Sequence, residues 1–476
     1  MLEKSMIVGG EKVDRKEKIE VVYPYTGEVI GRVPLGKEED VERAVERAKE
    51  GFKEISSLTP YERYKILMRA SEILERKAEE FARTLVLEVG KTIREARTEV
   101  QRAIQTLVFS AEEAKRVHGE TFLPDAHPNG KGKVGFYIRV PVGIVSAITP
   151  FNFPLNLSMH KVAPALAAGN AVILKPSERT PLTPLMLGEV LIEAGVPEKA
   201  ISVIPGYGDV GKAMTTHPDV RVVSFTGSRK VGEIISRQVG IKKLILELGS
   251  NSAIVVHRDA DMDRAVEKAV LGGYAIAGQV CISVQRVFVH EEVFEEFLER
   301  LKERVKTLRV GDPMDEGTDV GPMITEKETV RIREWIEEAV GMGAKLEVGG
   351  VACAEKTALF EPTVVSLVPP DAKLFKEEAF APVVVVDPYS DVDEAVDLVN
   401  RSEYGLQVGV FTKDIKVAWE FIRRVEAGGV LINEGPTFRV DHQPYGGFKS
   451  SGVGREGPRF AVEDYTEIKT VIFDLT

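Results

Sequence analysis

Short β-rich segments alternate with helical segments along the middle of this chain, and this alternation restricts the fold more than any other feature. Strand and helix in alternation are typical of a parallel sheet with helices on its faces. Ligands of such sheets bind beyond the carboxyl ends of the strands, so the loops at 150–154, 175–178 and 226–228 are candidate site loops. The first block predicts strands at Gly143–Thr149, Ala171–Lys175, Ile201–Ile204, Val220–Phe225 and Leu244–Leu248, and helices at Leu155–Ala168, Leu182–Ala194, Val210–Thr216 and Arg229–Val239.

A second alternating block follows, and we therefore predict an α/β fold. A chain of 476 residues exceeds what one hydrophobic core usually serves, so two or three domains are expected. The first third of the chain is expected to be helical, with apolar residues at helical spacing in Glu39–Phe52, Tyr61–Val89 and Thr92–Val117. The second block predicts strands at Ala253–Val256, Arg286–His290, Val383–Val386 and Val408–Phe411, and helices at Met262–Ala275, Glu292–Leu308, Val392–Asn400 and Ile415–Arg424.

Charge and composition exclude several classes of partner. The 63 basic and 74 acidic side chains give a net charge of -11, which argues against a nucleic-acid partner. The longest apolar runs, such as Ala163–Ala168, are far shorter than a membrane span, and residues 1–15 lack the apolar core of a signal peptide. The two cysteines, Cys281 and Cys353, are too few for a disulfide framework or a zinc site. We expect a cytoplasmic protein with no membrane, nucleic-acid or metal partner.

Three residues are candidates for chemistry. Cys281 follows Gly278 in a segment with more glycine than a packed helix tolerates, although an isolated cysteine is usually buried and inert. Glu247 ends an apolar strand, where it would be either a surface residue at the strand end or a desolvated carboxyl group, which would hold its proton more tightly and suit the activation of water. Asn152 lies between two prolines and two phenylalanines, where it would either cap the next helix or hold an oxyanion.

Two further loops have the residue types that bind a nucleotide. The segment Phe225–Gly232 contains a strand end, a glycine turn and a helix start, which together present backbone N–H groups to an anion. Lys175 and Glu178 follow another strand and suit ribose hydroxyls. Each of these signals is weak alone, because a surface ion pair or an ordinary turn would explain it equally well.

In combination, these segments resemble the aldehyde dehydrogenase superfamily, whose motifs occur here in the family's order across essentially the whole chain. The matching segments are PFNFP at 150–154, KPSE at 175–178, FTGS at 225–228, ELG at 247–249, GQVC at 278–281, EEAFAP at 377–382 and PYGGFKSSG at 444–452. The resemblance implies an enzyme that oxidises an aldehyde to a carboxylic acid with NAD, with NADP as the alternative. It also implies a Rossmann-like cofactor domain at 1–117 and 141–249 and a catalytic domain at 250–448. An oligomerisation arm and C-terminal segment would comprise 118–140 and 449–476.

The resemblance assigns roles to individual residues. Cys281 would attack the aldehyde as a thiolate, whose lowered pKa a nearby helix end or the cofactor charge would supply. Asn152 would hold the oxyanion, and Glu247 would activate the water that hydrolyses the thioester. The residues expected to bind the cofactor are Thr149, Phe151, Lys175, Ser177, Glu178, Gly208, Phe225, Thr226, Gly227, Ser228, Val231, Gly232, Leu248, Gly249, Glu378 and Phe380.

Four residues are candidates for binding the substrate: Arg102, His160, Arg439 and Phe448. The first three resemble a subgroup that acts on small polar or anionic aldehydes, and guanidinium groups suit carboxylates and phosphates. A lactaldehyde-type substrate is favoured. Val280 stands where some phosphate-specific relatives have arginine, which places glyceraldehyde 3-phosphate or a semialdehyde second.

The sequence leaves several alternative functions open. A cysteine hydrolase would need a His–Cys pair, and no histidine lies in a recognisable partner motif. A catalytically silent relative should have lost Cys281, Glu247 or Asn152. A coenzyme A-acylating dehydrogenase would typically lack Glu247. Edge strands near Val134–Arg139 and Ile468–Phe473 would make the protein a homodimer or homotetramer.

Overall fold

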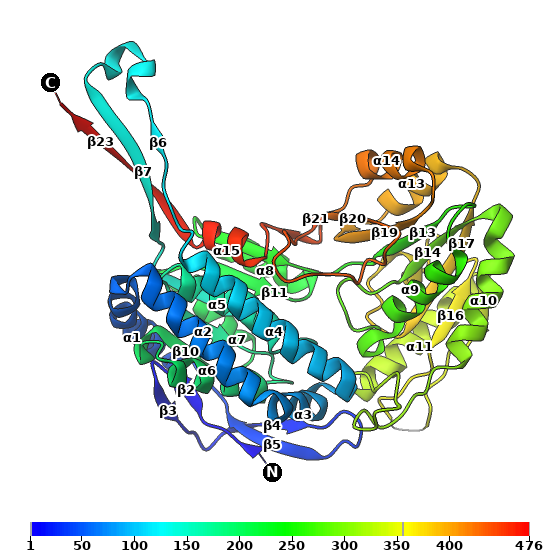
Figure 1. The fold of residues 1–476 in the computed structure, drawn as a ribbon. Coiled ribbons are helices and arrows are strands. Elements are labelled where there is room, and N and C mark those ends of the chain that lie inside the picture. The colour runs from blue at the N-terminus through cyan, green and yellow to red at the C-terminus, as the bar shows by residue number, and fades with distance from the viewer. Residues whose placement is uncertain (1, 355–356, 476) are drawn as a thin grey trace.

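The computed structural model describes residues 2–354 and 357–475, which form two α/β lobes and a projecting β arm (Figure 1). The first sheet has eight strands in the order β22-β12-β11-β8-β9-β10-β2-β3, of which β12 to β10 are parallel. Its strands are β22 (Gly452–Val453), β12 (Lys243–Glu247), β11 (Val220–Thr226), β8 (Ile144–Ile148), β9 (Ala171–Lys175), β10 (Ile201–Val203), β2 (Met6–Val8) and β3 (Glu11–Val13).

Helices cover this sheet and form the rest of the first lobe (Figure 1). They are α1 (Glu38–Ser57), α2 (Pro60–Arg76), α3 (Ala78–Val89), α4 (Ile93–Ala114), α5 (Asn156–Ala167), α6 (Leu182–Ala194), α7 (Gly208–Thr216), α8 (Arg229–Gln238) and α15 (Pro458–Asp464). The prediction of an α/β fold is confirmed, and the alternating segments between 143 and 248 lie within one or two residues of their predicted bounds.

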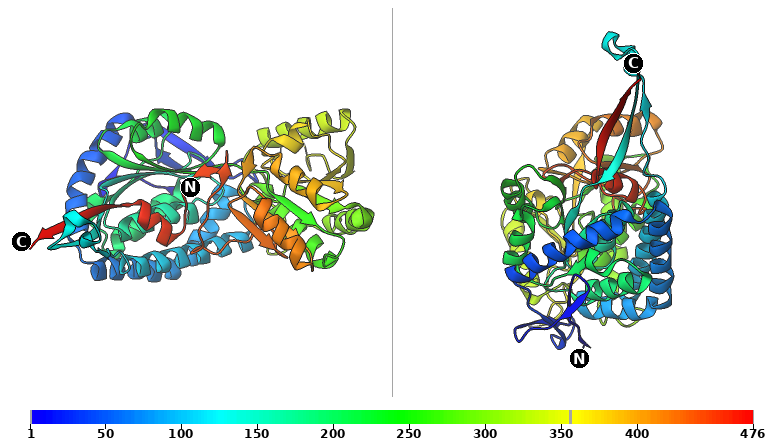
Figure 2. Two further views of the ribbon diagram at one scale, coloured as in Figure 1. Left: turned by 90° about the horizontal axis from the view of Figure 1, so that it is seen from above. Right: turned by 90° about the vertical axis from the view of Figure 1, so that its left-hand side faces the viewer.

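The second sheet has seven strands in the order β15-β16-β17-β14-β13-β19-β20, parallel except at β15. They are β15 (Lys345–Val348), β16 (Thr363–Ser366), β17 (Val383–Tyr389), β14 (Arg286–His290), β13 (Ala253–Val256), β19 (Gln407–Phe411) and β20 (Gly429–Ile432). The helices of this lobe are α9 (Met262–Tyr274), α10 (Phe294–Lys306), α11 (Glu326–Gly341), α12 (Lys373–Lys376), α13 (Val392–Asn400) and α14 (Ile415–Arg424). Figure 2 shows the two lobes side by side, and each has its own hydrophobic core.

The prediction that the first third is helical throughout is wrong for its beginning. Residues 2–34 form β1 (Leu2–Glu3), β2, β3, β4 (Lys18–Val22) and β5 (Val29–Pro34). These strands are two to six residues long, which is too short for an alternating pattern to stand out in the sequence. β2 pairs with β10 in an antiparallel arrangement, and this pairing between distant segments places it in the first sheet. The helix expected at Tyr61–Val89 is divided at Lys77 into α2 and α3.

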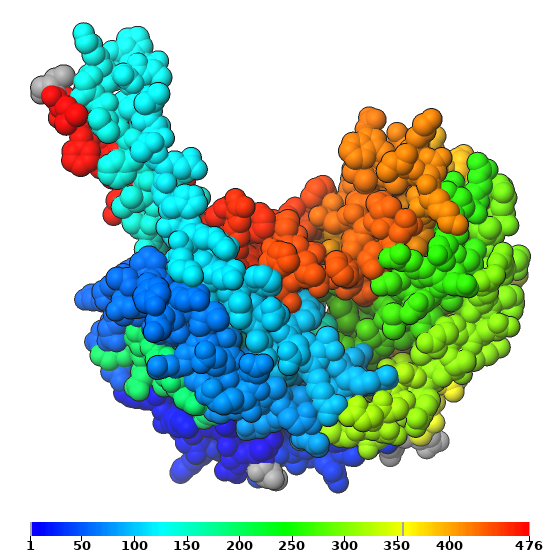
Figure 3. All heavy atoms as spheres, viewed as in Figure 1, coloured from blue at the N-terminus to red at the C-terminus, as the bar shows by residue number. Residues whose placement is uncertain are grey.

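The arm is a three-stranded sheet that stands clear of both lobes (Figure 3). Its strands are β6 (Thr121–Phe122), β7 (Lys133–Pro141) and β23 (Thr466–Asp474), with β7 in the middle. The prediction of an edge strand is therefore confirmed for Ile468–Phe473 but wrong for Val134–Arg139, because β6 and β23 pair with β7 on both sides. β23 pairs with β7 over its full length, from Thr466 with Pro141 to Asp474 with Lys133. A separate antiparallel pair joins β18 (Tyr404–Gly405) to β21 (Phe448–Lys449). Among the described residues, no helix is both long and apolar enough to cross a bilayer.

Candidate active site

The register of the first sheet brings the predicted site loops to one edge. Thr226 pairs with Glu247, and Phe225 pairs with Ile148, which in turn pairs with Lys175. These strands are parallel, so their carboxyl ends all point to the same side of the sheet. The loops that follow them therefore start within a few residues of one another, as expected for a ligand site in this fold class.

Asn152 does not cap the helix that follows it. α5 begins at Asn156, and its capping position is occupied by Leu155. The Asn152 Nδ2 atom instead donates to the Gln279 carbonyl oxygen at 2.9 Å, while Oδ1 accepts from the Phe153 N–H at 3.2 Å. The buried amide is thus held against the segment that carries Cys281. This geometry is compatible with an oxyanion-binding role and not with the capping interpretation.

The segment before Cys281 adopts an unusual backbone conformation. Ile276, Ala277 and Gly278 have φ values of 50°, 53° and 71°, a region that is costly for residues with a Cβ atom. A side chain at Gly278 would collide with the Ala381 carbonyl oxygen at 2.0 Å. Glu95 supports the turn, because its Oε1 accepts from the Ile276 N–H at 2.7 Å. This strained turn leads directly into the segment that carries Cys281.

The Cys281 thiol lies 3.2 Å from the Tyr445 hydroxyl. Burial raises the pKa of Cys281 to about 11, and the hydrogen bond from Tyr445 opposes this rise only in part. The expected lowering of the thiol pKa by a helix end is therefore wrong for the protein alone. Cys353, by contrast, is exposed.

Glu247 is 2% exposed, and neither carboxyl oxygen has a hydrogen-bond partner among the described residues. Burial, together with the charge of Glu456, raises the pKa of Glu247 well above its usual value. The predicted desolvation of this carboxyl group is confirmed. A buried carboxyl group with a raised pKa and free oxygens is a stronger base than an exposed one, and in its ionised form it can accept a proton from water.

A cavity of about 550 Å³ lies at the carboxyl edge of the first sheet. Eleven of the residues predicted to bind the cofactor line it: Thr149, Phe151, Lys175, Ser177, Glu178, Gly208, Phe225, Thr226, Gly227, Ser228 and Val231. α8 begins at Arg229, and its first turn has no side-chain cap from Ser228. The free N–H groups of this turn therefore suit the pyrophosphate of a dinucleotide.

Five further residues predicted to bind the cofactor lie next to the residues that line this cavity: Gly232, Leu248, Gly249, Glu378 and Phe380. A side chain at Gly232 would meet Leu248 at 2.5 Å, and one at Gly249 would meet the Glu378 carboxylate at 2.4 Å. The Phe380 ring packs edge-on against Phe151, with the ring centroids 5.8 Å apart. Burial raises the pKa of Glu378 to about 7, although its Oε1 accepts from the Ser250 N–H.

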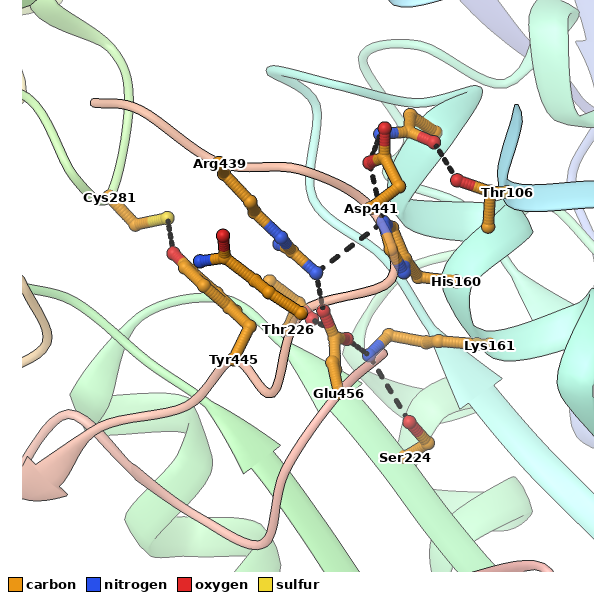
Figure 4. A network of polar contacts seen from close by, with 12 residues as sticks. Thr106, His160, Lys161, Ser224, Thr226, Cys281, Arg439, Asp441, Tyr445 and Glu456 are labelled. Atoms are coloured by element: carbon orange, nitrogen blue, oxygen red, sulfur yellow. Dashed lines mark hydrogen bonds and ion pairs between the residues drawn. The ribbon is translucent and has the colours of Figure 1, made fainter. Parts of the chain in front are cut away.

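A network of buried charges surrounds Arg439 (Figure 4). The Arg439 Nη2 atom lies 3.3 Å from Glu456 and 3.4 Å from the His160 Nε2 atom. Lys161 approaches the other oxygen of Glu456 at 2.8 Å. Two polar atoms of this network have no partner among the described residues: Arg439 Nε and His160 Nδ1.

Asp441 joins two of the predicted substrate-binding residues. One oxygen accepts from Arg102 Nη2 at 2.8 Å and lies 3.0 Å from His160 Nε2, and Asn156 Nδ2 donates to it at 3.0 Å. Burial would raise the pKa of Asp441, but the hydrogen bonds and charges of His160 and Arg102 outweigh burial and lower it. Arg102 also lines a second cavity of about 500 Å³, together with Phe153 and Ile276.

Phe448 lies apart from this network. It belongs to β21, is 45% exposed and has the Arg455 guanidinium 5.7 Å from its ring centroid. The structure thus joins Arg102 to His160 through Asp441 and places Arg439 next to His160, but it does not add Phe448 to them. In the described part of the chain, no cluster of three or more His, Cys, Asp or Glu side chains is arranged to hold a metal ion.

Sequence analysis missed four residues of this site: Lys161, Asp441, Tyr445 and Glu456. Lys161 had a detectable signal, because it directly precedes the apolar run Val162–Ala167 of its helix and a buried lysine requires a partner. The partner, Glu456, is 295 positions away, so the pairing could not be read from spacing. Tyr445 lies within the PYGGFKSSG motif, but nothing local indicates that its hydroxyl reaches Cys281.

The chain matches the model of the aldehyde dehydrogenase family over residues 12–471. It is 46% identical over 471 residues to the 3-sulfolactaldehyde dehydrogenase of Priestia aryabhattai, covering 99% of this chain and 98% of the relative. It is 39% identical over 472 residues to the lactaldehyde dehydrogenase of Methanococcus aeolicus, covering 98% and 99%.

A solved structure with the same fold is the glyceraldehyde-3-phosphate dehydrogenase GapN of Methanocaldococcus jannaschii, in complex with NADP. The TM-score is 0.93 at 39% identity, covering 97% of this chain and 100% of that one. These matches confirm the resemblance of the motifs. The chain belongs to the aldehyde dehydrogenase family and is an NAD(P)-dependent enzyme that oxidises small aldehydes.

Proposed function

We propose that this enzyme oxidises a small aldehyde that carries an anionic group, such as a sulfonate, to its carboxylic acid. The observation that carries the proposal is the buried Arg439 guanidinium, whose Nε–H has no partner among the described residues. A buried donor without a partner is costly, and an anionic oxygen would satisfy it. The similarity to a 3-sulfolactaldehyde dehydrogenase supports the same class.

The charge balance of the network also favours an anion. Three cations, Arg102, Lys161 and Arg439, face two carboxylates whose pKa values are lowered, Asp441 and Glu456. Burial and the charge of Arg439 lower the pKa of His160, so the neutral imidazole adds no charge to this network. The network therefore has one positive charge in excess. One negative charge on the substrate would neutralise it in a buried environment, where unpaired charges are disfavoured.

The proposed reaction uses Cys281, Asn152 and Glu247. The Cys281 thiolate attacks the aldehyde carbon, and the carbonyl π electrons move to the oxygen, which the Asn152 amide stabilises. When bound, NAD(P) supplies the acceptor for the hydride that leaves as this adduct collapses to a thioester. Glu247 then takes a proton from water, the water oxygen attacks the thioester, and the C–S bond breaks to release the acid and the thiolate.

The proposed cofactor site is the cavity above the first sheet. Gly227 and Ser228 would hold the pyrophosphate at the start of α8, and Lys175 and Glu178 would hold the adenosine ribose. Glu378 would hold the nicotinamide ribose next to Phe380. The Glu178 carboxylate favours NAD, because it would repel a ribose 2′-phosphate, although Lys175 and Arg179 could offset that repulsion for NADP.

We also propose a homodimer or homotetramer that assembles through the arm, in the cytoplasm. The arm exposes apolar side chains on β7 and β23, and β23 forms one edge of its sheet. Both cysteines are free thiols, as a reducing compartment requires.

Substituting Arg439 tests the substrate proposal. Replacement by glutamine should raise KM about 10- to 100-fold for 3-sulfolactaldehyde, because one charge-assisted hydrogen bond is lost. Lactaldehyde is the matched substrate without the sulfonate, and its KM should change much less. Arg102→Gln is the matched variant, since the Arg102 guanidinium is already held by Asp441.

The second candidate is lactaldehyde itself, which the sequence favoured and which the similarity to a lactaldehyde dehydrogenase supports. Equal kcat/KM for the two aldehydes in the wild-type enzyme would favour this candidate. A KM that rises equally for both in the Arg439 variant would exclude Arg439 from anion recognition.

A further inference from the structure

Tyr445 is the one residue whose side chain hydrogen-bonds to the Cys281 sulfur within the described part of the chain. Its hydroxyl oxygen is 3.2 Å from Sγ (Figure 4). In the resting enzyme either group can act as the donor. Once the thiol is ionised, only the tyrosine has a proton to give, so the O–H must then point at the sulfur.

Two interactions fix the position of this hydroxyl. The backbone of Tyr445 forms a bridge with Glu456, with N–O distances of 3.0 Å and 2.6 Å in the two directions. The Arg439 guanidinium carbon lies 3.6 Å from the centre of the Tyr445 ring. The side chain is 3% exposed, so water does not compete for the hydroxyl.

We propose that Tyr445 is a further catalytic residue, whose hydroxyl donates a hydrogen bond to the ionised Cys281 sulfur and stabilises the thiolate before it attacks the aldehyde. The Arg439 guanidinium assists, because a positive charge over the ring withdraws electron density and strengthens the O–H donor. This role goes beyond the proposed substrate and does not depend on which aldehyde is oxidised.

The surroundings of the sulfur explain why such a donor is needed. Burial disfavours the thiolate, and so do the charges of Glu378 and, when it is ionised, Glu247. Tyr445 and Arg439 act in the opposite direction. Burial also raises the pKa of Tyr445 well above its usual value, which keeps the hydroxyl protonated and able to donate at every pH where the enzyme works.

The test measures the reactivity of Cys281 without aldehyde or cofactor. All variants carry Cys353→Ser, because Cys353 is exposed and would also react. Tyr445→Phe removes the hydroxyl and keeps the ring. A hydrogen bond donated to a thiolate lowers the pKa of the thiol by about one to two pH units, so its loss should reduce the thiolate fraction about 10- to 100-fold. The remaining thiolate is more basic and therefore more nucleophilic, which offsets about half of this loss on a logarithmic scale. Alkylation by iodoacetamide should therefore slow about 3- to 10-fold at pH 8.

Tyr389→Phe is the matched control. Tyr389 is equally buried, and its hydroxyl lies 3.0 Å from His257 in the other sheet's core, so its loss should leave alkylation unchanged. Because phenylalanine is smaller, a purely steric role for Tyr445 would predict an unchanged or faster reaction in Tyr445→Phe, and either result overturns the proposal.

A spectroscopic titration provides an independent readout. The ultraviolet absorbance of the Cys281 thiolate, taken as the difference from a Cys281→Ser variant, should appear at a higher pH in Tyr445→Phe. An identical titration in both proteins would contradict the proposal. Failure of the substrate proposal would leave this result untouched, since no substrate is present.

Discussion

Glu247 illustrates at the scale of a residue how burial alone can prepare a group for chemistry. It ends β12 with both oxygens unpartnered among the described residues and with a raised pKa. Glu247→Gln should leave the first turnover of hydride transfer nearly intact but slow steady-state turnover about 10²- to 10⁴-fold, the usual contribution of a general base. Rapid-quench measurement of the burst against the steady state separates the two steps.

The pH dependence of thioester hydrolysis provides a further test of the role of Glu247. Because the carboxyl group must be ionised to accept a proton, the wild-type rate of thioester hydrolysis should rise with pH until Glu247 is deprotonated. The glutamine variant should lack this rise. If burst and steady state fall equally in the variant, Glu247 does not act at the hydrolysis step.

At the scale of an element, the start of α4 is coupled to the turn before Cys281. Thr92 and Glu95 form a capping box, in which Glu95 Oε2 accepts from the Thr92 N–H at 2.9 Å. The other Glu95 oxygen accepts from the Ile276 N–H. One carboxylate therefore caps a helix of the first lobe and holds the strained turn that carries the nucleophile.

This coupling predicts different effects for two cap variants. Thr92→Ala and Glu95→Ala should each lower the free energy of unfolding by about 1 kcal/mol, as measured by urea denaturation. Only Glu95→Ala should also lower kcat/KM, by about tenfold or more, since small displacements of a reacting group are costly. Thr92→Ala is thus the control, and equal kinetics in both variants would show that Glu95 does not position Cys281.

At the scale of the whole molecule, the arm has an apolar surface that the chain itself does not cover. On β23, Ile468 and Ile472 are 56% and 54% exposed. Exposed apolar side chains on an edge strand are typical of a surface that pairs with another chain. The proposed oligomer would bury them.

Introducing charge on this apolar surface should dissociate the assembly. Ile468→Glu combined with Ile472→Glu places two carboxylates where the proposed interface is apolar, and the mass measured by analytical ultracentrifugation should fall to a smaller species. Ile415→Glu is the control, because Ile415 is 75% exposed on α14 of the other lobe. An unchanged mass in the double variant would place the interface elsewhere, and a monomeric wild-type protein would exclude the proposed oligomer.

Much of the fold could be predicted because many helices and strands are marked by the pattern of apolar residues within their own segment. The strands β9 and β14 and the helices α6 and α14 lie at their predicted residues, since each is marked by apolar residues within its own segment. The short strands β2 and β3 could not be predicted, because β2 depends on pairing with β10, almost 200 residues away, and β3 pairs only with β2. The domain bounds at 117, 140, 249 and 448 stay a prediction. β22 and α15, from the C-terminal segment, lie against the first lobe.

The sequence by itself determined the class of this protein: an α/β fold, a cysteine with an asparagine and a glutamate in a recognisable order, and a nicotinamide cofactor. These follow from local patterns and motifs, which each segment carries alone. The tertiary structure alone decided that Asn152 points at the cysteine turn, that Asp441 joins Arg102 to His160, and that Tyr445 reaches the Cys281 sulfur. These contacts bridge more than 100 positions, and burial sets the proton affinities of Glu247 and Cys281. Pairing across the fold is not encoded in the spacing of neighbouring residues, and the burial of a single side chain depends on the distant segments that pack over it.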